Sequence, residues 1–289
     1  MSLKVLGLGD NVVDKYMHSR IMYPGGNALN FAANAKILGH AASYMGVFGT
    51  DEAANHVQNT IKELNIEMSH SKVISGENGA ARVKLENGDR IFLGSNKGGV
   101  LRENPMKLSG EDLEYIRGFD LVHTSLNSYL ESELEKIKST GVTLSFDFSV
   151  RGTDEYFQQV CPHVDYGFVS CGDITAAEMD EKAKKLLGMG CGIVVTTRGP
   201  EGSFYYDDKK KLSYKPPYID ALDTMGAGDS FLTGFLLYIV QWEKNGVNGK
   251  CDDAEKYDAI RAAMKKGSES AARTVMLHGG FGYGKNFSD

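Results

Sequence analysis

The stretch Asp223–Asp229 has the sequence DTMGAGD, and the apolar run Ser230–Leu236 (SFLTGFL) follows it directly. The small residues Gly226, Ala227 and Gly228 let the backbone approach a ligand closely, because no large side chain stands in the way. The apolar run predicts a buried helix that begins near Gly228. A helix that begins in such a turn presents unpaired N–H groups and the positive end of its dipole, which together bind anions such as phosphate.

Asp229 is the acidic member of this turn. A carboxylate repels phosphate, so its presence in an anion site indicates a chemical task. The task that fits is to accept the proton of a hydroxyl group that attacks a phosphorus atom. The alternative is that Asp229 only caps the helix, since Asp is a favoured N-cap residue.

The composition is typical of a large α/β enzyme. The chain has 289 residues, enough for a substantial core, and 34 of them are glycine. The net charge of −6 argues against a nucleic-acid partner, because nucleic-acid-binding proteins present a basic surface. We expect no membrane segment, because no run reaches the roughly 20 apolar residues that cross a bilayer. Lys4 and Asp10 interrupt the N-terminal region, which has no signal-peptide pattern.

Four cysteines are scattered through the second half of the chain, at Cys161, Cys171, Cys191 and Cys251. None belongs to a Cys-x-x-Cys pair, and their spacing does not match a zinc site. We therefore expect reduced thiols in a cytoplasmic protein.

Strand and helix patterns alternate along most of the chain, which predicts an α/β fold with a doubly wound, mostly parallel sheet. The main strands are expected near 5–9, 47–51, 121–123, 142–146, 166–169 and 193–195, and the main helices near 28–38, 52–64, 131–139, 228–242 and 253–274. The last residues are expected to be frayed. Asp10, Asn11 and Asp14 follow the first strand, where ligands gather in parallel sheets, although Asp and Asn are also ordinary turn residues.

A second glycine-rich turn, Gly25–Asn30 (GGNALN), opens the first helix. Asn27 and Asn30 are three residues apart, so they can share one face of its first turn. Neutral amides at this position suit the hydroxyl groups of a sugar.

A hairpin interrupts the strand–helix alternation. The extended stretches 80–85 and 90–93 flank Asn87 and Gly88, and Asn-Gly is a strong hairpin signal. We expect this hairpin to lie outside the parallel sheet as a flap or lid. Arg90 lies just past the turn and can reach over a ligand, or it is simply a solvated residue on an edge strand.

These features together resemble the ribokinase-like (PfkB) family of sugar kinases. The resemblance rests on Gly25–Asn30 and Asp223–Asp229, about 200 residues apart with the hairpin after the first motif. It implies one kinase domain over 1–289, with a small β lid formed by about 12–24 and 78–100. It also implies ATP and Mg²⁺ as cofactors, a small-molecule sugar substrate, and a homodimer through the lid.

The resemblance assigns roles to individual residues. Asp229 corresponds to the catalytic base, and the backbone of Gly226, Ala227 and Gly228 to an anion hole for the transferring phosphoryl group. The sugar-binding positions are Asp14, Gly26, Asn27 and Asn30, with Arg90 on the lid. The ATP-binding positions are Thr197, Gly199, Gly202, His278 and Gly279.

One motif departs from the family. An Asn-x-x-Glu that organises magnesium and phosphates is common there, whereas this chain has Ser170 and Asp173 at the matching positions. We expect Asp173 to act on magnesium through water, since magnesium keeps several of its waters.

Within the family the chain is most similar to kinases that phosphorylate fructosamine-type sugars such as fructoselysine on the 6-hydroxyl. The similar stretches include 9–14, 25–28, 89–92, 145–149 and 219–229. Three alternatives remain open. In the first, the kinase acts on another acceptor: fructose, ribose, ketodeoxygluconate or a nucleoside. In the second, the protein is a non-catalytic sugar or nucleotide sensor, although a sensor would not need Asp229. In the third, it is a dinucleotide-binding oxidoreductase, which is disfavoured because Val12 stands where the third glycine of that motif is expected.

Overall fold

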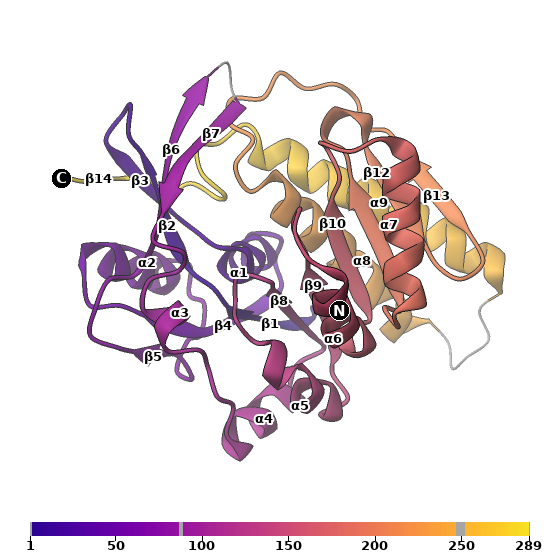
Figure 1. The fold of residues 1–289 in the computed structure, drawn as a ribbon, viewed down its shortest axis with the longest axis horizontal. Helices are drawn as coiled ribbons and strands as arrows, with labels where there is room; N and C mark the ends of the chain where they lie inside the picture. Colours follow the sequence, from indigo (N-terminus) through magenta and orange to yellow (C-terminus); the bar gives the residue numbers. More distant parts are fainter. Residues whose placement is uncertain (1, 87–88, 247–251, 289) are drawn as a thin grey trace.

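The computed structural model describes residues 2–86, 89–246 and 252–288. Within these residues, the large sheet contains nine strands in the order β13-β12-β11-β10-β9-β8-β1-β4-β5 (Figure 1). Their bounds are β1 (Lys4–Gly9), β4 (Ala41–Phe48), β5 (Lys72–Val73), β8 (Leu121–Ser125), β9 (Thr143–Asp147), β10 (Tyr166–Ser170), β11 (Ile193–Thr197), β12 (Ser203–Tyr206) and β13 (Lys211–Tyr214). Neighbouring strands from β5 to β11 run parallel, and β12 and β13 add an antiparallel edge. The predicted doubly wound, mostly parallel sheet is confirmed.

Helices cover both faces of this sheet. Their bounds are α1 (Asn27–Ile37), α2 (Glu52–Glu63), α3 (Val100–Glu103), α4 (Gly110–Arg117), α5 (Leu134–Ser139), α6 (Asp154–Val160), α7 (Ala176–Gly188), α8 (Ala227–Asn245) and α9 (Asp253–Thr274), with short 3₁₀ turns at Glu131–Glu133, Cys161–His163 and Gly199–Glu201. One apolar cluster joins the sheet to α1, α8 and α9, and another joins its opposite face to α4, α5, α6 and α7.

The core of each face follows from the alternation of side chains along the strands. On β11, Val194 packs into the cluster with α7, whereas its neighbour Val195 packs into the cluster with α8 and α9. A strand that is buried on both faces carries apolar residues at successive positions, which explains the β-branched run of β11.

A second sheet stands beside the large one, with the order β14-β3-β2-β6-β7 among the described residues (Figure 1). Its strands are β2 (Val12–Tyr16), β3 (Ile21–Gly25), β6 (Gly79–Glu86), β7 (Asp89–Ser95) and β14 (Lys285–Asn286). The predicted hairpin pairs β6 with β7 outside the parallel sheet, while the Asn87-Gly88 turn itself lies outside the described residues. We call this second sheet the lid sheet.

The C-terminal end corrects the prediction of frayed last residues. Lys285 and Asn286 pair with Met22 and Ile21 of β3, and Phe287 is buried at 7% exposure. The apolar side chain of Phe287 joins the cluster that holds α1 and α2 against the lid sheet, and this burial fixes the segment.

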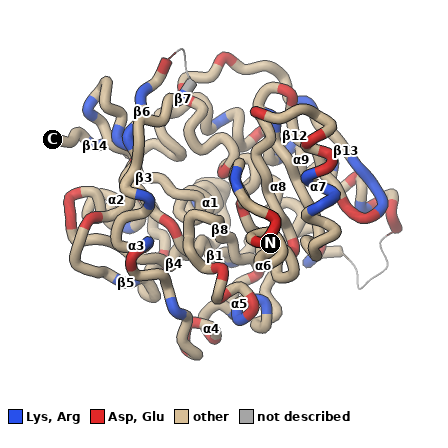
Figure 2. Tube along the Cα trace, in the orientation of Figure 1, with Lys and Arg blue, Asp and Glu red and all other residues tan. Residues whose placement is uncertain are grey.

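Charges are spread over the surface. Figure 2 shows Lys and Arg interspersed with Asp and Glu along the trace, in keeping with the acidic net charge of the chain. Among the described helices, none is long and apolar enough to cross a membrane.

Candidate active site

The turn before α8 holds backbone N–H groups open to an anion. Gly226 has φ 71°, which a residue with a side chain rarely adopts, and a Cβ there would lie 2.5 Å from Cα of Gly280. Ala227 N donates to Thr224 O at 3.3 Å, but no described residue accepts a hydrogen bond from the N–H groups of Gly226, Gly228 or Asp229. Free donors at a helix N-terminus are what the predicted anion site requires, and anion binding by this turn stays a prediction.

Asp229 is buried beside this turn, with 9% of its surface exposed, and faces α1. Asn30 Nδ2 donates to Asp229 Oδ2 at 2.6 Å, and Asn27 Nδ2 donates to Oδ1 at 2.9 Å. The N-cap of α8 is Gly226, with no side-chain capping bond. The alternative that Asp229 only caps its own helix is therefore wrong, because its carboxylate accepts hydrogen bonds from another helix.

A second carboxylate shares the same amide. Asn27 Nδ2 also donates to Asp147 Oδ2 at 2.9 Å, and Ser149 N donates to Asp147 Oδ1 at 2.7 Å. Burial, and after it the negative charge of Asp229, raises the pKa of Asp147 to about 7. Burial raises the pKa of Asp229 to about 6, because the hydrogen bonds from Asn30 and Asn27 offset only part of the effect. The site thus holds a carboxyl group whose pKa is near neutrality, as a general base requires.

Asp14 lies on β2 of the lid sheet and is only 5% exposed. It accepts no hydrogen bond from any described residue, and burial raises its pKa to about 7 although the positive charge of Arg90 lowers it. Gly25 leaves room for this carboxylate, because a Cβ there would lie 2.5 Å from Asp14 Oδ2. A buried carboxyl group without a hydrogen-bond partner needs an explanation, and contact with sugar hydroxyl groups stays the prediction for Asp14.

Arg90 reaches from β7 of the lid sheet to the anion-binding turn. Its Nη1 lies 2.9 Å from Sδ of Met225, and its charge lowers the pKa of both Asp14 and Asp229. The structure therefore brings the predicted lid residue to the predicted site, although its side chain is exposed.

Asp10 and Asn11 have structural tasks. Asp10 accepts hydrogen bonds from the N–H groups of Asn27 and Ala28 at 2.8 and 3.2 Å and from two serine hydroxyls, so it caps α1. Asn11 donates to Tyr44 OH and Val47 O. These bonds reach distant segments of the chain, so the local turn chemistry that the sequence offered as the alternative does not account for them.

On the other side of the α8 turn, the carboxyl ends of three strands border a small pocket. Its polar lining comes from Asp147, Ser170 and Thr197, together with Gly228 of α8. Gly199 and Gly202 follow Thr197 with φ 51° and 105°, and a Cβ at Gly202 would lie 2.2 Å from Tyr214 O. This pocket lies next to Gly228, where the sequence predicts that nucleotide phosphates bind, and that contact stays a prediction.

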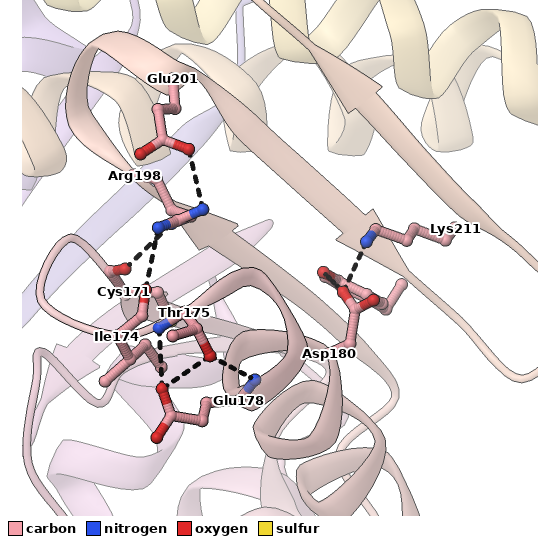
Figure 3. Close-up of polar contacts among 9 residues, drawn as sticks. Cys171, Ile174, Thr175, Glu178, Asp180, Arg198, Glu201 and Lys211 are labelled. Carbon is pink, nitrogen blue, oxygen red and sulfur yellow. Dashed lines mark hydrogen bonds and ion pairs between the residues drawn. The ribbon is translucent and has the colours of Figure 1, made fainter.

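One arginine ties the two loops beside this pocket together. Arg198 donates to the carbonyl oxygens of Cys171 and Ile174 at 3.3 and 2.9 Å and pairs with Glu201 at 2.8 Å (Figure 3). The loop that it holds contains Asp173, whose side chain is exposed. Thr175 and Glu178 then close a capping box at the start of α7.

Comparison with known proteins identifies the family. The model of the pfkB family carbohydrate kinases matches residues 2–279. The chain belongs to this family. It is 41% identical over 285 residues to fructosamine kinase FrlD of Bacillus subtilis (strain 168), with 98% of this chain and 94% of that protein covered. It is 29% identical over 276 residues to fructoselysine 6-kinase of Escherichia coli (strain K12), covering 94% and 97%. The solved structure of ribokinase from Giardia lamblia matches with a TM-score of 0.82 at 18% identity, covering 97% and 95%.

As a pfkB family member, the protein is an ATP-dependent carbohydrate kinase, and this likeness bears out the sequence-based recognition and fold. Asn27 and Asn30 contact Asp229, and Gly26 is the N-cap residue of their helix, while their predicted contact with sugar hydroxyl groups stays a prediction. A Cβ at Gly26, which has φ 108°, would lie 2.9 Å from Cα of Asn11.

His278 and Gly279 lie on the lid side of the kinase site. Gly279 N donates to Asp223 Oδ2 at 2.9 Å, and the His278 ring lies 6.1 Å from that of Tyr23. The structure thus places them beside the lid sheet, while Thr197 lies at the pocket on the other side of the α8 turn. Their predicted contact with ATP stays a prediction.

Sequence reasoning gave no role to Asp147, Asp223, Asn127 or Tyr16. Asn127 Nδ2 donates to Asn27 Oδ1 at 2.9 Å and so orients the amide that serves Asp229. Asp147 ends a strand at the edge of the sheet where ligands bind, so its position in the sequence could have marked it as a candidate site residue. Tyr16 and Asn127 lie in stretches without a local motif.

The residues present fit magnesium bound mainly by phosphates and water. Among the described residues, no group of three or more His, Cys, Asp or Glu side chains is placed to hold a metal ion. Asp147, Ser170 and Thr197 nevertheless supply oxygen atoms at the pocket, and oxygen is the ligand that magnesium prefers.

Proposed function

We propose that this kinase transfers the γ-phosphoryl group of ATP to the 6-hydroxyl of a fructosamine-type sugar such as fructoselysine. The names of two relatives that align over nearly their whole length support this acceptor. The observation that carries the reaction type is Asp229, held by two amides at a helix N-terminus with free N–H groups.

In this proposal Asp229 accepts the proton of the attacking hydroxyl. Asn27 and Asn30 each hold one carboxylate oxygen, and the remaining lone pairs can accept the proton of the hydroxyl group. The free N–H groups of Gly226 and Gly228 offset the negative charge of the transferring phosphoryl group, and Ala227 contributes the turn that presents them. Asp14 and Arg90 bind the sugar from the lid side.

Asp147 and Asp173 are the candidates for holding magnesium through water. When bound with ATP, magnesium neutralises charge on the phosphate oxygens. Asp147 is the better placed of the two, because it lines the pocket next to Gly228, whereas Asp173 is exposed. A buried aspartate at the end of β9 would then compensate for the missing Asn-x-x-Glu.

We also propose that the protein is a single kinase domain whose lid sheet excludes water and pairs with a second copy. Phe92 and Leu93 are 57% and 47% exposed on β7, the edge strand of the lid sheet, and favour such contact. A cytoplasmic location stays a prediction, which the free thiols of Cys161, Cys171 and Cys191 favour.

The test is ADP formation by purified protein with ATP, magnesium and a panel of acceptors. The panel contains fructoselysine, other fructosamines, fructose, ribose, ketodeoxygluconate and adenosine. A clear preference for fructoselysine supports the proposal. Preference for another sugar keeps the reaction type and replaces the acceptor, and ATP binding without turnover on any acceptor favours the sensor alternative.

A further inference from the structure

Asp223 is fully buried at the base of the anion-binding turn. Three donors bind its carboxylate: Tyr16 OH at 2.6 Å, Gly279 N at 2.9 Å and Met225 N at 2.9 Å. Tyr16 belongs to β2 of the lid sheet and is only 1% exposed. One carboxylate thus connects the lid sheet, the C-terminal segment and the turn that presents the free N–H groups.

The apolar contacts join the same parts. Met225, in the middle of the turn, is 5% exposed and packs with Tyr16, Tyr23 and Val83 in one small cluster. These three partners come from β2, β3 and β6 of the lid sheet. The ring of Tyr23 packs edge-on against that of Tyr16, with 4.9 Å between centroids. The buried side chain of the anion-binding turn, Met225, therefore packs against the lid sheet and not against the large sheet.

We propose that Tyr16 and Asp223 are positioning residues that make the anion hole depend on the lid sheet. Asp223 Oδ1 holds Met225 N, and Met225 precedes the left-handed Gly226 that aims the free N–H groups. Its other oxygen, Oδ2, accepts from Tyr16 OH and from Gly279 N. Without the Tyr16 bond, Oδ2 keeps only the Gly279 N–H, the carboxylate is held less firmly and the turn relaxes, so the donors are fully aligned only while the lid sheet is seated.

This inference rests on the proposed function and adds a property to it. If the lid sheet closes on the sugar, its seating aligns the anion hole when the acceptor hydroxyl is present. Without that seating, the lid sheet no longer excludes water, which then competes with the sugar hydroxyl for the γ-phosphorus and hydrolyses ATP to ADP and phosphate. The Tyr16–Asp223 bond thereby couples ATP use to sugar phosphorylation.

The chain offers a matched control for the test. Tyr205 on β12 is fully buried and donates from its hydroxyl to Asp207 Oδ2 at 2.8 Å, at the far edge of the large sheet. Tyr205→Phe therefore removes the same kind of buried tyrosine–aspartate bond as Tyr16→Phe, but away from the anion hole.

The experiment measures ADP formed and sugar phosphate formed in the same reactions, with fructoselysine as the acceptor. We expect Tyr16→Phe to lower kcat by about 10- to 10²-fold, the range that misplacement of catalytic groups produces. We also expect the ratio of ADP to sugar phosphate to rise above that of the wild type. Tyr205→Phe should keep the wild-type ratio, even if both variants melt at a lower temperature.

A Tyr16→Phe protein with the wild-type kcat and ratio would overturn the inference. Asp223→Asn is measured in parallel, because an amide has only one oxygen to accept hydrogen bonds, so the same loss of coupling is expected if Tyr16→Phe does not fold. A folded Asp223→Asn with wild-type coupling also overturns it. Wild-type protein that phosphorylates no acceptor overturns the proposed function instead, which keeps the two failures distinct.

Discussion

Asn30 on α1 and Asp229 on α8 lie 199 residues apart in the chain and share a 2.6 Å hydrogen bond. The bond joins the first turns of the two helices that follow the two glycine-rich motifs. An amide nitrogen donates but does not accept, so it binds the ionised carboxylate; Asn30 holds Oδ2 and Asn27 holds Oδ1, which fixes the orientation of the group. The relationship fixes the orientation of Asp229, the proposed base, and leads to the following predictions.

Asp229→Asn should keep the fold and lose most turnover. The amide preserves the size of the side chain but cannot accept the proton, so kcat should fall about 10² to 10⁴-fold. Coupled ADP assays and thermal melting are the measurements. Asp208→Asn, at an exposed aspartate in the β12–β13 turn, is the control and should leave kcat unchanged. Near-normal turnover by Asp229→Asn removes the base assignment.

The activity should depend on the ionisation of Asp229. The base is active only when deprotonated, so kcat/KM should rise with pH through a pKa of about 6. Arg90 lowers this pKa with its positive charge, so Arg90→Gln should move the acidic limb of the pH profile to higher pH. Arg90→Lys, which keeps the charge, should not move it. If the acidic limb of the pH profile does not move in Arg90→Gln, the guanidinium group does not lie close enough to Asp229 to lower its pKa.

Asp14→Asn should stabilise the folded protein and weaken sugar binding. The folded protein raises the pKa of Asp14 to about 7, so the ionised carboxylate destabilises the fold increasingly as pH rises from the unfolded pKa through the folded pKa. At about pH 8 we expect Asn to raise the melting temperature by about 2 °C or more, which ~1 kcal/mol gives. At about pH 4 the difference should vanish. Sugar KM should rise, and an unchanged KM speaks against sugar contact.

Gly228→Ala tests the anion hole sterically. No atom lies within 4 Å of a Cβ at this position, so the folded protein has room for the methyl group. The added methyl group would, however, occupy the space that a bound phosphoryl group needs in the proposed anion hole. We expect unchanged or higher thermal stability, because Ala favours a helix, together with a loss of turnover of about tenfold or more. Gly188→Ala, a helical position with open space in α7, serves as the control and should also keep or raise the thermal stability, but leave turnover unchanged.

Magnesium dependence distinguishes the two candidate aspartates. Asp147→Asn should raise the magnesium concentration for half-maximal activity about tenfold, the effect of an outer-shell partner. Asp173→Asn should have a smaller effect, because that side chain is exposed. The reverse order would favour the sequence-based assignment of Asp173.

The sequence was informative where chemistry demands a local pattern. The glycines before α8 have a fixed spacing because the turn at a helix N-terminus requires it. The two asparagines of α1 are three residues apart because that spacing places them on one face of the helix. The alternation of strands and helices predicted the large sheet for the same reason. These signals depend only on neighbouring residues.

Contacts between distant segments left no such signal. Tyr16 and Asp223 are 207 residues apart, and nothing in the stretch around Tyr16 marks its partner. The two-residue strand β14 was missed because a strand of this length has no periodicity to detect. The sequence favoured Asp173 for magnesium because it stands in a motif position. The difference in burial between Asp147 and Asp173 exists only in the folded chain, so the sequence could not show it.

The lid sheet is assembled from 12–25, 79–95 and 285–286, so its strands leave the ribosome at widely separated times. Its edge strand β14 pairs with β3 only after Lys285 and Asn286 have been synthesised. The sheet that carries Asp14 and Arg90 is therefore complete only when segments from three distant parts of the chain are present together.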